Sequence, residues 1–69
     1  MGTYKVIEIV GTSNESWADA AREALKTASK TLRDLRVAEV TRMDIRYDDQ
    51  GKILFRTRLE VSFKVQTVE

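Results

Sequence analysis

The sequence predicts a single α+β domain, spanning residues 1–69, in which one helix packs on a three-stranded antiparallel sheet in the order β-α-β-β. Three observations support this fold class. Residues 53–65 alternate between apolar and polar side chains, and residues 14–34 repeat apolar side chains at helical spacing. Between two β-rich segments, residues 48–51 are turn formers, which is typical of a hairpin.

The last strand, residues 53–65, has the clearest pattern in the chain. Side chains of a strand alternate between two faces, so one face of this segment is apolar and the other is polar. The polar face carries opposite charges, including Arg56, Arg58 and Glu60. The apolar face comprises Ile53, Phe55, Thr57, Leu59, Val61, Phe63 and Val65.

The first strand is predicted at Tyr4–Val10, where β-forming residues precede Gly11. Apolar residues occur on both of its faces, which a strand buried on one side only would not need. Helix start signals follow directly. Thr12 as N-cap, with Glu15 three residues later, makes a capping box, and Ser13 is the alternative N-cap.

The helix is expected from about residue 14 to residue 34. Its buried stripe is rich in alanine, which lets the helix lie close to a sheet but buries little area per residue. The stripe comprises Trp17, Ala20, Ala21, Ala24, Leu25, Ala28, Leu32 and Leu35. We interpret Trp17 as an anchor at the start of the helix that packs on the sheet or on a neighbouring subunit.

The second strand is predicted at Arg36–Tyr47, and its apolar residues change parity partway along. A β-bulge near Thr41 and Arg42 resolves this conflict. With the bulge, one set of residues faces the helix: Ala38, Val40, Met43, Ile45 and Tyr47. The other set faces away from it: Val37, Glu39, Asp44 and Arg46.

Gly51 suits the positive φ of the hairpin turn between the second and third strands. The first and second strands run in the same direction because the helix returns the chain between them. A third strand placed between them makes the sheet fully antiparallel, in the order 1-3-2. It is also the longest regular strand, which suits a central position.

Composition excludes several classes of function. The chain has no cysteine and no histidine, which removes disulfides, thiolate catalysis, the commonest general base and the usual metal ligand. The net charge of +1 argues against a dedicated nucleic-acid binder. No run of about 18 apolar residues is present, so we predict a soluble cytoplasmic protein without a membrane partner.

Size argues for self-association. A domain of 69 residues rarely builds a core that is stable alone, and disulfides and a zinc site are excluded by composition. Oligomerisation is the remaining common means of stabilisation. The composition therefore predicts a homo-oligomer.

The chain resembles the dodecin family over nearly its whole length. The residues that carry the resemblance are the segment 4–13 (YKVIEIVGTS), the alanine-rich helix, the step Glu39-Val40 and the segment 59–63 (LEVSF). The resemblance implies a β-α-β-β protomer whose sheet curls around the helix. It further implies a hollow homododecamer that binds and stores flavins such as FMN between subunits, without catalysis.

In that family a tryptophan stacks on the flavin ring, and a glutamine on the last strand hydrogen-bonds the edge of the ring. The matching positions here are Val37 and Arg56. Valine offers no π surface, and arginine has donors but no acceptor. The sequence therefore predicts an altered ligand pocket, for which the candidate residues are Val37, Arg56, Arg46 and Arg58.

Some dodecins that lack the flavin residues resemble a calcium-binding branch, so Ca²⁺ is an alternative ligand. Carboxylates suit this hard cation. The candidate metal ligands are Asp44, Glu60 and Asp48, with Glu39 and Asp49 as further carboxylates. Turn formation by Asp48 and ion pairing by Asp44 and Glu60 are the plainer interpretations.

Two other classes of function are compatible with the sequence. An adaptor or RNA-binding module could use the arginines on the outward face of the sheet, although that face has few aromatic residues. An enzyme would depend on carboxylate, lysine or tyrosine side chains alone. We predict a protein that is not an enzyme.

Overall fold

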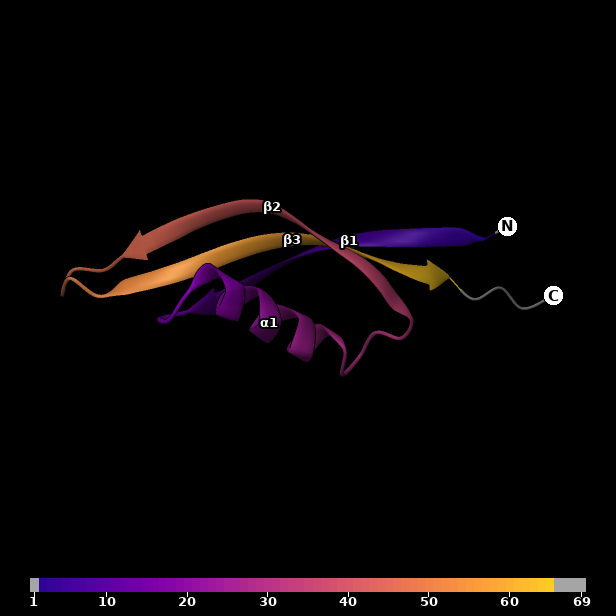
Figure 1. Cartoon of the computed structure of the whole chain (residues 1–69), viewed down its shortest axis with the longest axis horizontal. Coiled ribbons are helices and arrows are strands. Elements are labelled where there is room, and N and C mark those ends of the chain that lie inside the picture. The colour runs from indigo at the N-terminus through magenta and orange to yellow at the C-terminus, as the bar shows by residue number, and fades with distance from the viewer. Residues whose placement is uncertain (1, 66–69) are drawn as a thin grey trace.

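The computed structural model describes residues 2–65 and has the predicted order of elements (Figure 1). The strands are β1 (Thr3–Ser13), β2 (Leu35–Tyr47) and β3 (Ile53–Val65), and the helix is α1 (Trp17–Ala28). The α+β prediction is therefore confirmed. No helix in the described part of the chain has the length and apolar character needed to cross a membrane.

The sheet has the strand order β1-β3-β2, and both pairs are antiparallel, which confirms the predicted 1-3-2 arrangement. The helix α1 contacts β1 and β3 on one face of the sheet. The strands arch over α1, so the helix lies on the concave side and the opposite face is convex (Figure 1). We call the convex side the outward face.

The core is small and lies between α1 and the middle of β3. Its most buried side chains are Leu59 and Val61, with Ala20, Ala24 and Ala28 from the helix. The helix can approach this closely because Gly11 of β1 has no side chain. A Cβ at Gly11 would fall on the carbonyl oxygen of Ala20 and within 2.8 Å of the Ala24 Cβ.

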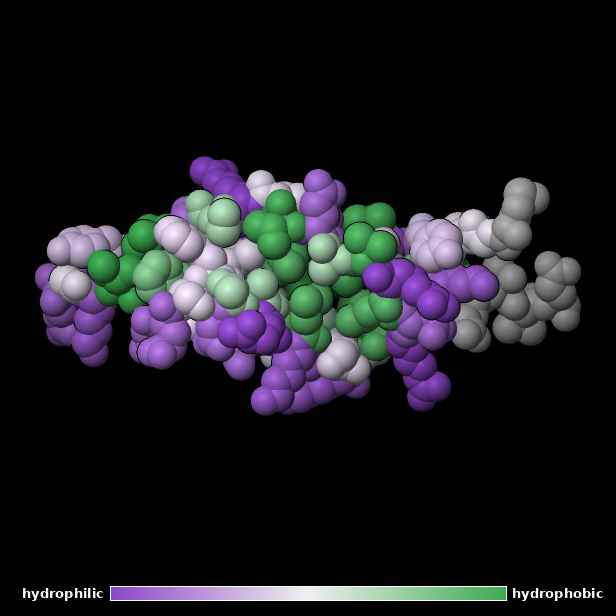
Figure 2. Space-filling view, in the orientation of Figure 1, coloured by the Kyte–Doolittle hydropathy of each residue, from purple (hydrophilic) through white to green (hydrophobic). Residues whose placement is uncertain are grey.

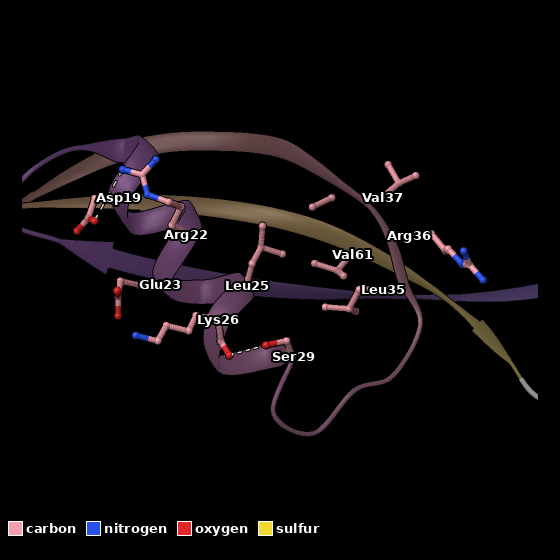
Figure 3. A pocket seen from close by; sticks show the side chains of 11 residues that line it. Asp19, Arg22, Glu23, Leu25, Lys26, Ser29, Leu35, Arg36, Val37 and Val61 are labelled. Atoms are coloured by element: carbon pink, nitrogen blue, oxygen red, sulfur yellow. Dashed lines mark hydrogen bonds and ion pairs between the residues drawn. The ribbon is translucent and has the colours of Figure 1, made fainter.

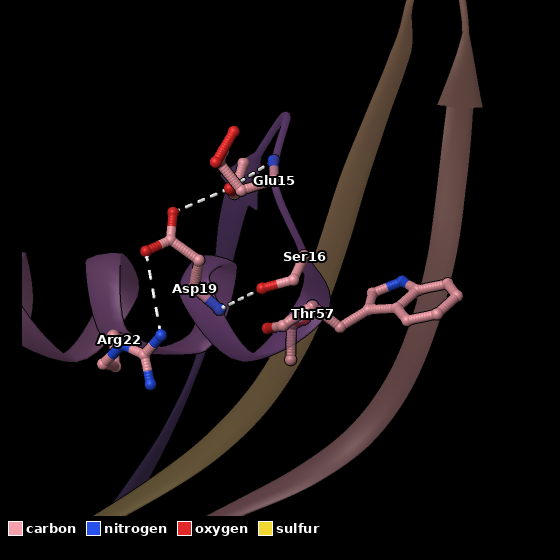
Figure 4. Close-up of polar contacts among 7 residues, drawn as sticks. Glu15, Ser16, Asp19, Arg22 and Thr57 are labelled. Carbon is pink, nitrogen blue, oxygen red and sulfur yellow. Dashed lines mark hydrogen bonds and ion pairs between the residues drawn. The ribbon is translucent and has the colours of Figure 1, made fainter.

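The helix begins later than the sequence predicted, and neither Thr12 nor Ser13 is its N-cap. β1 continues through both residues, and Ser16 is the N-cap, whose Oγ accepts a hydrogen bond of 3.0 Å from the Asp19 backbone N–H (Figure 4). Ser13 instead donates to the Asp19 carboxylate at 2.7 Å and accepts from the Glu15 N–H. The capping-box prediction was wrong because β1 pairs with β3 as far as Ser13.

Replacement of Ser16 by alanine is expected to lower the free energy of unfolding by about 1 kcal/mol, because the first turn loses its capping acceptor. Thr12 is the matched control, since it is exposed on the outward face opposite Arg56. Thr12→Ala should change stability by less than about 0.5 kcal/mol. Urea unfolding at one fixed protein concentration measures both variants, and equal effects would contradict the assignment of Ser16.

The helix also ends earlier than predicted, at Ala28 rather than near residue 34. Ser29 is the C-cap, and Asp34 has a φ of 59°, in the left-handed region that aspartate tolerates. Leu32 and Leu35 keep helical spacing in the sequence, but Leu35 already belongs to β2. The chain therefore uses these residues to reverse direction rather than to extend α1.

The predicted bulge in β2 is confirmed by a register shift between Val40 and Arg42, and a second shift, not predicted, lies between Leu35 and Val37. Register places the predicted set on the helix side of the sheet, because Ala38, Val40, Met43, Ile45 and Tyr47 oppose Val61, Leu59, Thr57, Phe55 and Ile53. The helix nevertheless does not cover β2. Met43 is 56% exposed and Tyr47 is 71% exposed.

Trp17 anchors the start of the helix to the sheet, as predicted. Its indole ring lies edge-on to Phe55 with centroids 5.0 Å apart, and its Nε1–H donates to the Asp44 carbonyl oxygen at 2.9 Å. Thr57 Oγ1 donates to the Trp17 carbonyl oxygen. In the turn between β2 and β3, Gly51 has the expected positive φ of 81°.

Candidate functional site

The outward face of the sheet carries most of the predicted site residues. Arg56 and Arg58 project from β3, between β1 on one side and β2 on the other. Asp44 of β2 lies opposite Arg56, and Arg42 of β2 lies opposite Arg58. Register therefore gathers these four charged residues into one patch.

Asp44 and Arg56 form a two-pronged ion pair. Arg56 Nε donates to Asp44 Oδ1 at 2.7 Å, and Arg56 Nη2 donates to Asp44 Oδ2 at 2.9 Å. This fork is the strong geometry for arginine and carboxylate. The hydrogen bonds from Arg56 hold the pKa of Asp44 below its usual range, with Arg42 and Arg58 adding to the effect, and the same contact raises the pKa of Arg56.

The neighbouring arginine is also paired. Arg58 Nη1 lies 3.5 Å from Glu8 Oε1 across the β1–β3 pair. Between the charged side chains and Val10 is a hollow of about 10 Å³, which holds at most one water molecule. Within one protomer, Arg56 and Arg58 therefore both contact carboxylates, and the space between them is too small for an organic ligand.

Two of the predicted ligand-binding residues lie apart from this patch. Val37 lies opposite Ser62 toward the start of β2 and is 64% exposed. Arg46 lies opposite Leu54, beyond Asp44 along the strand. Neither lines the hollow between Arg56 and Arg58.

The three candidate metal ligands are not brought together. Asp48 lies in the hairpin turn, where its Oδ1 accepts hydrogen bonds from the backbone N–H groups of Gln50 and Lys52 at 2.9 and 2.8 Å. Both carboxylate oxygens of Asp44 are bonded to Arg56. Glu60 is exposed in the middle of the sheet. Within residues 2–65, no group of three or more carboxylates is placed to hold a metal ion.

A groove between α1 and β2 was not anticipated from the sequence (Figure 3). Its volume is about 760 Å³, and its apolar lining comprises Leu25, Leu35, Val37, Ala38 and Val61. Charged residues form the rim, including the Asp19–Arg22 pair at 4.0 Å. The groove lies where α1, which packs mainly on β1 and β3, leaves the first part of β2 uncovered.

A second groove runs along the other side of the helix, between α1 and β1. It has a volume of about 520 Å³, and small residues line it, among them Gly11, Ala24 and Ala28. The alanine stripe of the sequence is the signal that could have indicated it. Apolar surface also reaches the exterior across the middle of the molecule (Figure 2).

Comparison with known proteins gives a consistent result. The family model described as Dodecin matches residues 3–66. A curated relative named calcium dodecin, from Mycobacterium tuberculosis, is 48% identical over 69 residues, covering 100% of this chain and 97% of the relative. A dodecin from Thermus thermophilus is 38% identical over 63 residues, covering 91% of each chain.

Solved structures agree with these sequences. The crystal structure of the Mycobacterium tuberculosis protein, described as a calcium-chelating antigen with a novel calcium-binding site, has a TM-score of 0.87 at 48% identity and covers 97% of this chain and 96% of that one. A dodecin from Streptomyces davaonensis has a TM-score of 0.87 at 32% identity, with 96% and 97% covered. The chain belongs to the dodecin family, and a calcium dodecin is among its relatives.

Proposed function

We propose that the protein is a non-catalytic binding protein that assembles into a homododecamer of the dodecin type and takes calcium rather than a flavin as its ligand. The observation that carries the proposal is the two-pronged pair between Arg56 and Asp44. It occupies the position where the resemblance places the glutamine that bonds the edge of a flavin.

Exposed apolar surface supports assembly. The fully buried apolar side chains of the protomer are few, whereas β2 leaves large apolar residues uncovered on its helix side. Val40 is 47% exposed, Ile45 is 47% exposed and Tyr47 is 71% exposed. Contiguous apolar surface of this kind marks a protein interface. Copies of the same chain can cover this surface and fill the two grooves beside α1.

The outward face supports the loss of flavin binding. A flavin edge needs both donors and acceptors, but Arg56 supplies donors only and already shares two of them with Asp44. Val37 offers no ring on which a flavin could stack. A flavin would also have to separate the ion pair.

Calcium as the ligand is supported by the relative named calcium dodecin and by the exposed carboxylates of Glu39 and Glu60 on the outward face. Of the predicted ligands, Glu60 has a carboxylate that makes no hydrogen bond or ion pair within residues 2–65, and carboxylate oxygens are the donors that Ca²⁺ prefers. Asp44 would have to leave Arg56 first. In a dodecamer, carboxylates from several copies can contribute to one site.

The proposal is tested by three measurements on one preparation. Sedimentation should give a particle with the mass of twelve 7.9-kDa chains. Riboflavin and FMN should keep their fluorescence when titrated with the protein at micromolar concentration. Calorimetry on metal-stripped protein should show calcium binding that weakens at least tenfold in Glu60→Gln, with Asp48→Asn as the matched control.

Each part can fail separately. A monomer would overturn the assembly, and strong flavin quenching would overturn the loss of the flavin site. Absence of heat at millimolar calcium would overturn the choice of ligand.

A further inference from the structure

The outward face carries two charged rows of opposite sign that run across the three strands. Glu8, Glu60 and Glu39 are directly paired in register across β1, β3 and β2. The adjacent row on the same face is Val10, Arg58 and Arg42. We call these the acidic row and the basic row.

The two rows flank the middle of the sheet. Leu59, which lies between Arg58 and Glu60, is the central residue of β3. Because the strands arch over α1, the outward face is convex and its highest part is near its middle (Figure 1). A flat or convex body that touches this face therefore meets the acidic and basic rows first.

Within one protomer the rows are poorly compensated. Like charges directly opposite each other on neighbouring strands destabilise a sheet, and here that holds for both Glu60 pairs and for the pair Arg58–Arg42. Glu8 and Arg58 form the ion pair that joins the rows, at 3.5 Å. Within residues 2–65, the side chains of Glu39, Glu60 and Arg42 make no hydrogen bond or ion pair.

We propose that this face docks on the same face of a second copy, about a two-fold axis that runs across the strands between the rows. This operation places the acidic row of each copy on the basic row of the other. Glu60 then meets Arg58 of the second copy, Glu39 meets Arg42, and both contacts are repeated by symmetry, as an isologous interface requires. A two-fold axis along the strands would place glutamate on glutamate.

The inference rests on the proposed homo-oligomer and assigns one of its contacts to named charges. Because two convex faces meet over a small area, charge rather than apolar burial dominates this contact. It should therefore weaken with salt, since the Debye length falls from about 10 Å at 0.1 M to about 3 Å at 1 M. An arginine uses only part of the acceptor capacity of a carboxylate, so calcium at Glu60 is compatible with the contact.

A pair of charge-reversed variants tests the docking. The first, Glu39→Lys with Glu60→Lys, makes both rows basic. The second, Arg42→Glu with Arg58→Glu, makes both rows acidic. Lys30→Glu is the control for a charge reversal outside the two rows, because Lys30 is exposed just beyond the end of the helix, away from this face.

Each reversed variant alone should form smaller particles than the wild type at 0.05–0.1 M salt, as measured by sedimentation, because like charges then face each other across the two-fold axis. An equimolar mixture should recover the wild-type particle, since a basic copy can dock on an acidic one. The control should assemble normally. Circular dichroism and the emission of Trp17 verify that each variant is folded.

Three results would overturn the inference without touching the proposed function. Reversed variants that assemble like a wild-type oligomer would remove these charges from the interface. If the equimolar mixture does not form the wild-type particle, the acidic row of one copy does not dock on the basic row of another. If only the basic variant fails, and chelation of calcium dissociates the wild type, the acidic row binds a cation instead. A monomeric wild type would overturn the proposed assembly itself.

Discussion

Replacement of Gly11 by alanine is expected to prevent the chain from folding. A Cβ at this position would clash with the carbonyl oxygen of Ala20 and approach the Ala24 Cβ to 2.8 Å, so the helix would have to move away from β1. Overpacking typically costs 1–3 kcal/mol, and more where the obstacle is backbone. A single core of this size rarely supplies more than about 3–5 kcal/mol, so the loss should be comparable to the whole stability.

Circular dichroism and urea unfolding measure this effect. Gly2→Ala is the matched control, because the nearest atom to its added Cβ is the flexible Lys64 side-chain Cε, at 3.3 Å. The control should fold with a stability within about 0.5 kcal/mol of the wild type. A Gly11→Ala variant with unchanged helix content and unfolding midpoint would show that α1 does not pack directly against the backbone of β1 at Gly11.

The double substitution Val37→Trp with Arg56→Gln is expected to strengthen flavin binding, which the proposed function denies to the wild type. Tryptophan at position 37 supplies a stacking surface of about 150–250 Å² on an exposed strand position, so it should not disturb the protomer. Glutamine at position 56 supplies both a donor and an acceptor and removes the fork that closes on Asp44. We expect at least a tenfold gain in affinity for riboflavin, measured by quenching of its fluorescence.

Val37→Leu with Arg56→Gln separates stacking from apolar bulk. Leucine covers similar surface without a ring, so this control should bind riboflavin much less than the tryptophan variant does. If the two variants bind equally, stacking at position 37 does not decide the specificity. If neither binds while both assemble, the positions carried over from the family do not form the ligand pocket in this chain.

The order and pairing of the elements could be predicted because each depends on local patterns. The alternation of residues 53–65 places Leu59 and Val61 in the core, and the parity change at Thr41 indicates the bulge. The ends of the helix could not be predicted in the same way. Several serine and threonine residues before Trp17 can cap a helix, and pairing of β1 with β3 through Ser13 decides among them.

Part of the candidate site was also accessible from the sequence. Strand parity places Asp44, Arg56 and Arg58 on the outward face, but the two-pronged contact depends on the register, and the register depends on the bulge. The sequence predicted that the apolar residues of β2 would face the helix, and we expected the helix to cover them. The pattern shows that Met43 and Tyr47 need cover, but it carries no information on which chain provides it.

The two outer strands have a consequence for how the protein must be made. β1 pairs with β3 along one side only, over Thr3–Ser13 without a register shift, so the backbone groups on its other side can accept a further strand. The bulges in β2 interrupt the outer edge of β2, whereas the outer edge of β1 has no such interruption. Newly synthesised chains therefore carry an aggregation hazard at β1, and productive association has to outpace uncontrolled strand addition in the crowded cell.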